Sequence, residues 1–229
     1  MKINADFSQQ VVVEADEVSW VPSPIPGVER RILDRVGDEV ARATSLVRYA
    51  PGSRFSPHVH TGGEEFFVLQ GVFQDEHGDF PAGSYIRNPP TSSHTPGSDE
   101  GCIIFVKLWQ FDLADRTPVK IDTNKIGSVR DADRPGVSVT PLFQDARETV
   151  QLEQWAPGTS VDRPMPEGAE LLVLDGDMAL SGDVLRKHAW LRIPLHGHLQ
   201  ACAGSGGTRV WIKTRHLRFV DAPALDSRP

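Results

Sequence analysis

The sequence predicts an all-β fold made of two tandem barrels. The 18 prolines and 20 glycines are spread along all 229 residues, which favours many short strands joined by tight turns. The most apolar runs are rich in β-branched and aromatic residues, as strands usually are: Val11–Glu14, Cys102–Val106, Leu171–Leu174 and Val210–Ile212. Helical periodicity is scarce, and residues 28–35 fit either a strand or a turn or two of helix. An internal repeat of a length that suits one small barrel completes the argument.

Four short segments recur in the same order, 105 or 106 residues later in the chain. The pairs are Ala50–Ser53 with Ala156–Thr159, Val68–Gly71 with Val173–Gly176, Ile86–Pro89 with Leu191–Pro194, and Phe105–Lys107 with Trp211–Lys213. Such constant spacing indicates two copies of one unit. We therefore expect two domains, residues 1–118 and 119–229, with a polar connection over about residues 116–134.

The composition excludes several classes of protein. No run approaches the ~18 apolar residues of a transmembrane helix, and the opening residues have no apolar signal core, so we expect a cytoplasmic protein without membrane contact. A net charge of −7 argues against binding to nucleic acid. The two cysteines, Cys102 and Cys202, lack metal-ligand spacing and read as small buried residues.

The segment from Gly52 to Gly71 carries the strongest chemical signal. His58 and His60 are two residues apart, so on a β-strand both imidazoles project from one face. A turn at Thr61-Gly-Gly then leads into a strand that begins at Glu64, whose side chain can fold back toward the histidines. Two imidazoles and a carboxylate form a site for zinc, iron, manganese or nickel.

The whole pattern, Gly-x5-His-x-His-x3-Glu-x6-Gly, resembles the first motif of the cupin superfamily, whose domains are double-stranded β-helix or jelly-roll barrels. Pro81-Ala-Gly83 fits the core of the second cupin motif, but Ile86 stands where the family usually places its third histidine. A histidine follows later, at His94. With this late histidine, the segment of about residues 20–107 is similar to the cupin domain of ChrR-type anti-sigma factors. The resemblance implies that His58, His60, Glu64 and His94 are metal ligands.

The second copy of the repeat has lost this chemistry. Pro164 and Pro166 stand where the first copy has its two histidines, and proline offers no ligand atom. Only Glu170 matches the acidic position. A makeshift site built from Glu170 with His196 and His198 is the less favoured alternative. We therefore expect a degenerate second cupin and one divalent ion per chain, with zinc preferred over iron, manganese or nickel.

The same four ligands fit two classes of function. Zinc bound tetrahedrally by all four gives a closed structural site, whereas octahedral iron, manganese or nickel keeps two positions open. The resemblance implies a sensory or regulatory protein with a partner in transcription. The His-x3-Cys-x2-Cys signature of the sigma-binding domain is absent from the sequence, so we do not expect direct sequestration of a sigma factor.

The alternative is a non-haem iron dioxygenase of the diketone-cleaving type, to which ChrR-like cupins are similar. A barrel interior lined by Phe66, Val68, Ile86 and Phe105 would hold a small organic ligand. Arg48 and Arg87 are candidates for orienting an anionic group, with surface ion pairs as the competing interpretation. Since cupins commonly associate through sheet edges or faces, a homodimer also stays open.

Overall fold

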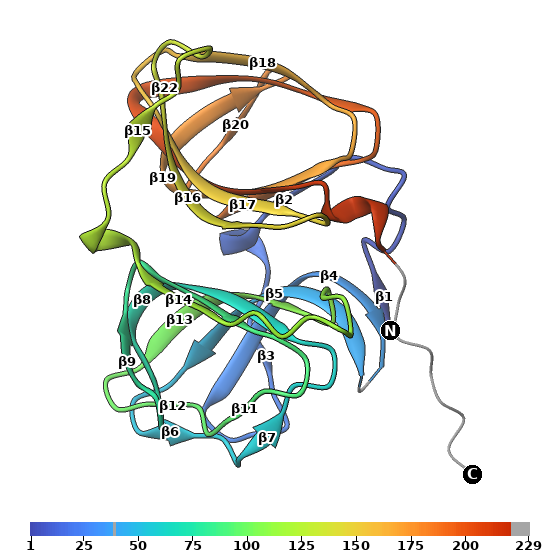
Figure 1. The fold of residues 1–229 in the computed structure, drawn as a ribbon, viewed down its shortest axis with the longest axis vertical. Coiled ribbons are helices and arrows are strands. Elements are labelled where there is room, and N and C mark those ends of the chain that lie inside the picture. Colours follow the sequence, from blue (N-terminus) through green and yellow to red (C-terminus); the bar gives the residue numbers. More distant parts are fainter. Residues whose placement is uncertain (39, 221–229) are drawn as a thin grey trace. The chain divides into compact units, whose positions relative to one another are not determined.

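The computed structural model describes residues 1–38 and 40–220 (Figure 1). These residues form strands β1–β22 and three single-turn 3-10 helices, Ala15–Glu17, Thr123–Lys125 and His216–Arg218. The predicted all-β fold is confirmed. Residues 28–35, which fitted either a strand or a short helix, are part of a strand. The described chain divides into two units. The first contains residues 1–5 and 19–125, and the second contains residues 6–18 and 126–220.

The first unit is built on an antiparallel sheet with the order β1-β4-β5-β13-β8-β10-β14. Its strands are β1 (Lys2–Ile3), β3 (Val21–Pro22), β4 (Val28–Gly37), β5 (Ala41–Tyr49), β6 (Ser53–Arg54), β7 (His58–Val59), β8 (Glu64–Asp75), β9 (Gly78–Pro81), β10 (Ser84–Asn88), β11 (Ser93–His94), β12 (Gly97–Ser98), β13 (Cys102–Leu108) and β14 (Val119–Asp122). The short strands β7 and β11 pair only with each other among the described residues.

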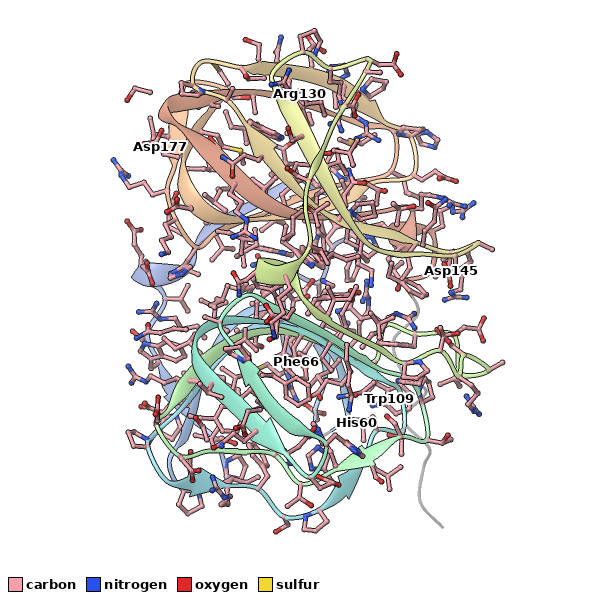
Figure 2. The ribbon with its side chains drawn as sticks, turned by 60° about the vertical axis from the view of Figure 1, so that its left-hand side comes forward. His60, Phe66, Trp109, Arg130, Asp145 and Asp177 are labelled. Carbon is pink, nitrogen blue, oxygen red and sulfur yellow. The ribbon has the colours of Figure 1, made fainter. Side chains whose placement is uncertain are left out.

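The core of the first barrel comes from alternate residues of its long strands. Side chains two apart on a strand share a face, so Ile104 and Val106 of β13 point the same way as Phe66 and Val68 of β8. All four are almost fully buried and pack in one apolar cluster. Figure 2 shows Phe66 within the barrel, with His60 and Trp109 toward one end.

The second unit repeats this plan with the order β15-β16-β17-β22-β19-β21-β2. Its strands are β2 (Val11–Glu14), β15 (Val129–Arg130), β16 (Val137–Gln144), β17 (Thr149–Trp155), β18 (Ser160–Met165), β19 (Ala169–Leu180), β20 (Asp183–Leu185), β21 (Ala189–Ile193) and β22 (Gly197–Thr214). Large side chains, among them Trp155, Met165 and Met178, fill its interior.

The two repeats exchange one strand each. The strand β2, near the start of the chain, pairs with β21 in the second unit, and β14 pairs with β10 in the first. Each is followed directly by a 3-10 helix, at Ala15–Glu17 and at Thr123–Lys125. Residues 119–122 therefore complete the first sheet, although the repeat spacing places them after the 118/119 boundary expected from the sequence.

Candidate metal centre

A two-stranded ribbon positions three histidines. His58 of β7 lies directly opposite His94 of β11, and backbone bonds of 2.9 Å from His60 N–H to the Ser92 carbonyl and from Thr91 N–H to the His60 carbonyl extend the pairing. Because side chains alternate along β7, His58 and His60 share a face as predicted. The late histidine of the sequence is thus the cross-strand neighbour of the first one.

A glycine turn brings the carboxylate to the same place. Gly63 adopts φ +77°, a left-handed conformation that favours glycine, and the chain then enters β8 at Glu64. Residue 64 pairs with Asn88 of β10 on one side and with Leu108 of β13 on the other. Two neighbouring strands therefore fix the backbone from which the Glu64 side chain starts.

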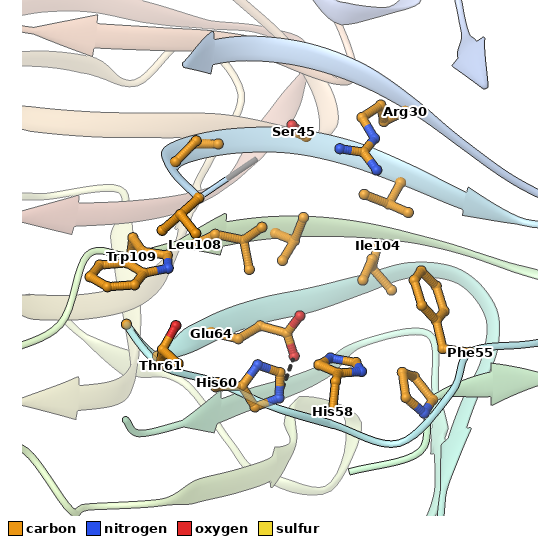
Figure 3. A pocket seen from close by; sticks show the side chains of 18 of the residues that line it. Arg30, Ser45, Phe55, His58, His60, Thr61, Glu64, Ile104, Leu108 and Trp109 are labelled. Atoms are coloured by element: carbon orange, nitrogen blue, oxygen red, sulfur yellow. Dashed lines mark ion pairs between the residues drawn. The ribbon is translucent and has the colours of Figure 1, made fainter. Parts of the chain in front are cut away.

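The four predicted residues lie close together in the structure. One ring nitrogen from each of His58, His60 and His94 lies within 4.8 Å of the others. The Glu64 Oε2 atom is 3.6 Å from His60 Nε2 and 3.5 Å from His94 Nε2. Figure 3 shows His58, His60 and Glu64 converging, with the pair between His60 and Glu64 dashed. This is the donor set that borderline divalent metals use.

Hydrogen bonds orient two of the imidazoles. His58 Nδ1 lies 3.1 Å from the Ser56 carbonyl oxygen, and His94 Nδ1 lies 3.2 Å from the Asp75 Oδ2 atom. A carbonyl or a carboxylate only accepts, so Nδ1 carries the proton and Nε2 keeps its lone pair. Such a bond to the far ring nitrogen is typical of metal-binding histidines. Sequence reasoning missed Asp75, which lies 19 residues before His94.

Burial and charge act in opposite directions on these groups. Burial alone would lower the pKa of His94, but the hydrogen bond that it donates to Asp75 and the charge of Glu64 outweigh burial and raise the pKa overall. For His60, burial dominates and lowers the pKa, although the Glu64 charge opposes it. The site therefore holds His60 in the neutral form that binds a metal.

The donor atoms have room for an ion. His60 Nε2 and His94 Nε2 are buried, and neither forms a hydrogen bond with any residue that the structure describes. Buried polar nitrogens of this kind are rarely left without a partner. Both point toward the Glu64 carboxylate at more than hydrogen-bonding distance. A divalent cation satisfies all of these atoms at once, so the residues fit a metal.

His58 and His60 border a cavity of about 340 Å³ inside the first barrel. Its walls are mostly apolar, with polar groups at a few positions; the lining includes Val28, Val47, Phe55, Ile104, Val106, Leu108 and Trp109 together with Arg30, Ser45, Tyr49 and Glu64. Phe66, Val68 and Ile86, predicted to line such a pocket, are packed in the core instead. They occupy the neighbouring layer of the same barrel interior.

The two arginines suggested by the sequence are engaged elsewhere. Arg48 Nε donates to Glu29 Oε2 over 3.0 Å, and its guanidinium lies 4.5 Å from the centre of the Trp20 ring. Arg87 is buried and forms a 2.7 Å ion pair with Asp115. Neither lines the cavity, so the competing interpretation of both arginines as ion-pair partners is the one that the structure supports. Two arginines of β4, Arg30 and Arg35, line the cavity instead, and the alternation with Val28 could have identified Arg30.

The second barrel does not bring a comparable set of ligands together. His198 pairs with Asp162 at an exposed position, and Glu170 lies 3.2 Å from His216 in the interior. The makeshift site of Glu170 with His196 and His198 is therefore not assembled. Over residues 1–38 and 40–220, the three histidines of the first barrel form the one group of three or more potential ligands.

The sequence of the first unit matches a known domain family. Residues 8–112 match the model of the ChrR Cupin-like domain. The chain thus has the two-barrel fold of bicupins, with a ChrR Cupin-like domain in its first half. The family match covers the entire segment from which the candidate metal ligands come.

Solved bicupin structures share the fold at low sequence identity. A candidate dioxygenase from Nostoc punctiforme is 16% identical, with a TM-score of 0.77 over 92% of this chain and 84% of that one. The bacterial pirin YhhW from Escherichia coli, solved in complex with nickel(II), is 15% identical, with a TM-score of 0.61 over 90% of this chain and 99% of its own. YlbA from E. coli is 14% identical, with a TM-score of 0.69 over 92% of this chain and 93% of its own.

No curated protein is similar enough in sequence to count as a relative. Among the described residues, no helix has the length and apolar character needed to cross a membrane.

Proposed function

We propose that the first barrel binds one divalent metal ion through His58, His60, Glu64 and His94, and that the metal acts on a small organic molecule held in the adjoining cavity. The buried, unpartnered nitrogens of His60 and His94, with His60 on the wall of that cavity, carry this proposal. A purely structural zinc site would need no such space beside it.

The cavity favours an open coordination shell, and therefore an oxygenase-type reaction. Iron, manganese or nickel held by His58, His60, Glu64 and His94 would keep coordination positions free for other molecules and would supply Lewis-acid and redox chemistry at the cavity wall. The apolar walls keep bulk water from the reacting groups. This enzyme class suits the site better than a closed zinc site does.

Tyr49 supplies a proton donor beside the metal ligands. It lines the cavity from β5, and its ring packs against Phe55 and Phe73, with centroids 5.4 Å and 5.8 Å away. Burial and the charge of Glu64 hold its pKa well above the usual value, so the phenol stays protonated near neutral pH. A neutral phenol can donate a hydrogen bond to an oxygen of the bound molecule.

Oxygen consumption tests this function. Protein loaded with Fe²⁺ without oxygen is given a panel of 1,3-dicarbonyl compounds in aerated buffer, and dissolved oxygen is followed with an electrode. We expect uptake that needs both metal and dicarbonyl and that disappears in His60→Ala. His77→Ala, at an exposed hairpin position, is the matched control and should keep full uptake.

A sensory role is the second candidate, because the family match is to the ChrR Cupin-like domain. A sensor would bind the same ligand at the same metal without consuming oxygen. Metal-dependent binding of a dicarbonyl with oxygen uptake at background would therefore favour the sensor. Absence of both binding and uptake in metal-loaded protein would contradict both roles.

A further inference from the structure

Arg30 lines the metal cavity from near the start of β4. It pairs with Val47 of β5, and two residues away Val28 pairs with Tyr49. Val28, Arg30, Val47 and Tyr49 all line the cavity, as the alternation of both strands requires. Figure 3 shows Arg30 across the cavity from His58 and His60. A cation and the metal ligands thus face one space from different walls.

The charge of Arg30 is not neutralised by the protein. Its guanidinium donates to Ser23 Oγ over 2.7 Å, and it forms no ion pair with any described acidic residue. Arg35 adds a second cation to the cavity wall. Burial, and then the charge of Arg35, lower the pKa of Arg30, but an arginine stays protonated near neutral pH.

A half-buried cation without a counterion is costly unless something else satisfies it. Arg48, an arginine of the same sheet that does not line the cavity, has an acidic partner. It lies on β5, paired in register with Glu29, and that neighbour provides its counterion. Glu29 and Arg48 are the residues adjacent to the cavity-facing pairs, so they project from the opposite face of the sheet.

We propose that the cavity accepts a small organic anion whose carboxylate pairs with Arg30 while its other end reaches the metal. The guanidinium offers two parallel N–H donors that match a carboxylate. The carbon skeleton lies against Val47, Ile104 and Val106, and a volume of about 340 Å³ suits a small ligand. This inference rests on the proposed function, since the metal anchors the other end.

Two-headed probes test it on the full-length, nickel-loaded protein. Each probe carries a hydroxamate, which binds the metal, and an aliphatic chain of varied length that ends in either a carboxylate or the isosteric carboxamide. Isothermal titration calorimetry gives the Kd of each probe. At the best chain length we expect the carboxylate to bind at least about tenfold more tightly, which is typical of a charge-assisted pair.

Two variants assign this preference to one residue. Arg30→Gln should reduce the ratio of the two Kd values to about one and leave the nickel content unchanged. Arg48→Gln, on the other face of the sheet, should keep the wild-type ratio. The comparison of the two tails on wild-type protein is a test in itself and needs no variant to fold.

The contradicting outcomes separate the two proposals. Hydroxamates that bind at the metal with no preference for a carboxylate at any chain length would overturn the anion site alone. The same holds if Arg30→Gln keeps the preference. Protein that takes up no nickel, or that binds no hydroxamate when loaded, would overturn the proposed function and the anion site with it.

Discussion

At the scale of single residues, part of the candidate site can be predicted from the spacing of residues in the sequence, and part depends on how distant strands pair. The two-residue spacing of His58 and His60 places both rings on one face, and the structure confirms this. Asp75 could not be predicted in the same way, because its link to His94 depends on where two distant strands meet. A local sequence pattern does not specify that meeting point.

The hydrogen bond that His94 donates to Asp75 should contribute to the metal affinity. Replacing Asp75 by Asn keeps its shape but removes the charge that orients His94, so we expect metal affinity to fall by about tenfold to a hundredfold. Competition titration with a chelating indicator measures this. Asp79→Asn is the matched control in the same hairpin, since Asp79 bonds to Gln74 and not to a histidine. Equal losses in the two variants would contradict this role.

At the scale of elements, the turn before β8 determines where the Glu64 carboxylate lies. A Cβ atom added to Gly63 would overlap the Phe111 ring, and φ is +77° there. Gly52 has almost the same φ, +75°, yet a Cβ there meets no atom within 4 Å. At both positions the backbone conformation would strain any other residue, but only at Gly63 would a side chain also collide with a neighbour.

Alanine substitutions at Gly52 and Gly63 can measure how much the turn before β8 contributes to stability and to the position of Glu64. Gly52→Ala should cost only the strain of a left-handed residue, about 1–2 kcal/mol. Gly63→Ala should add the cost of overpacking, about 1–3 kcal/mol, and displace Glu64, so metal affinity should fall as well. Urea denaturation and metal titration of both variants provide the comparison. Gly63→Ala protein with the stability and affinity of Gly52→Ala would show that the contact with Phe111 is unimportant.

The sequence predicted where strands occur better than it predicted which face of the sheet each residue occupies. Val11–Glu14 and Cys102–Val106 were recognisable from β-branched content and are strands. Alternation with Val28 places Arg30 on the cavity face of β4, but the bulge between Ile32 and Asp34 shifts the register, so alternation alone does not predict that Arg35 also lines the cavity. Arg48 of β5 projects from the other face of the sheet, where Glu29 provides its counterion.

At the scale of the whole molecule, the repeat is built with reciprocal strand exchange. The sequence shows two copies, but it does not show that β2 belongs to the second sheet and β14 to the first. Both strands are short, and the choice between two similar sheet edges depends on tertiary pairing. The second copy keeps this plan, with Pro164 in β18 and Pro166 directly after it at the positions of His58 and His60 in the first copy.

Strand exchange predicts how the chain tolerates truncation. A fragment of residues 1–125 keeps β14, whereas a fragment of residues 1–118 leaves the edge of β10 unpaired. We expect the shorter fragment to melt at least about 4 °C lower, the shift that about 1 kcal/mol produces in a domain of this size, and to aggregate more readily. Thermal unfolding and light scattering measure both. Indistinguishable fragments would mean that β14 contributes nothing to the first sheet.

Metal quantification tests the central claim most directly. Protein saturated with a divalent metal, freed of excess and analysed by elemental mass spectrometry should hold one equivalent per chain. His60→Ala should hold almost none, because an open position is left where the fold supplied a ligand. His196→Ala should still hold one. Two equivalents in the wild type, or full occupancy in His60→Ala, would contradict a single metal centre in the first barrel.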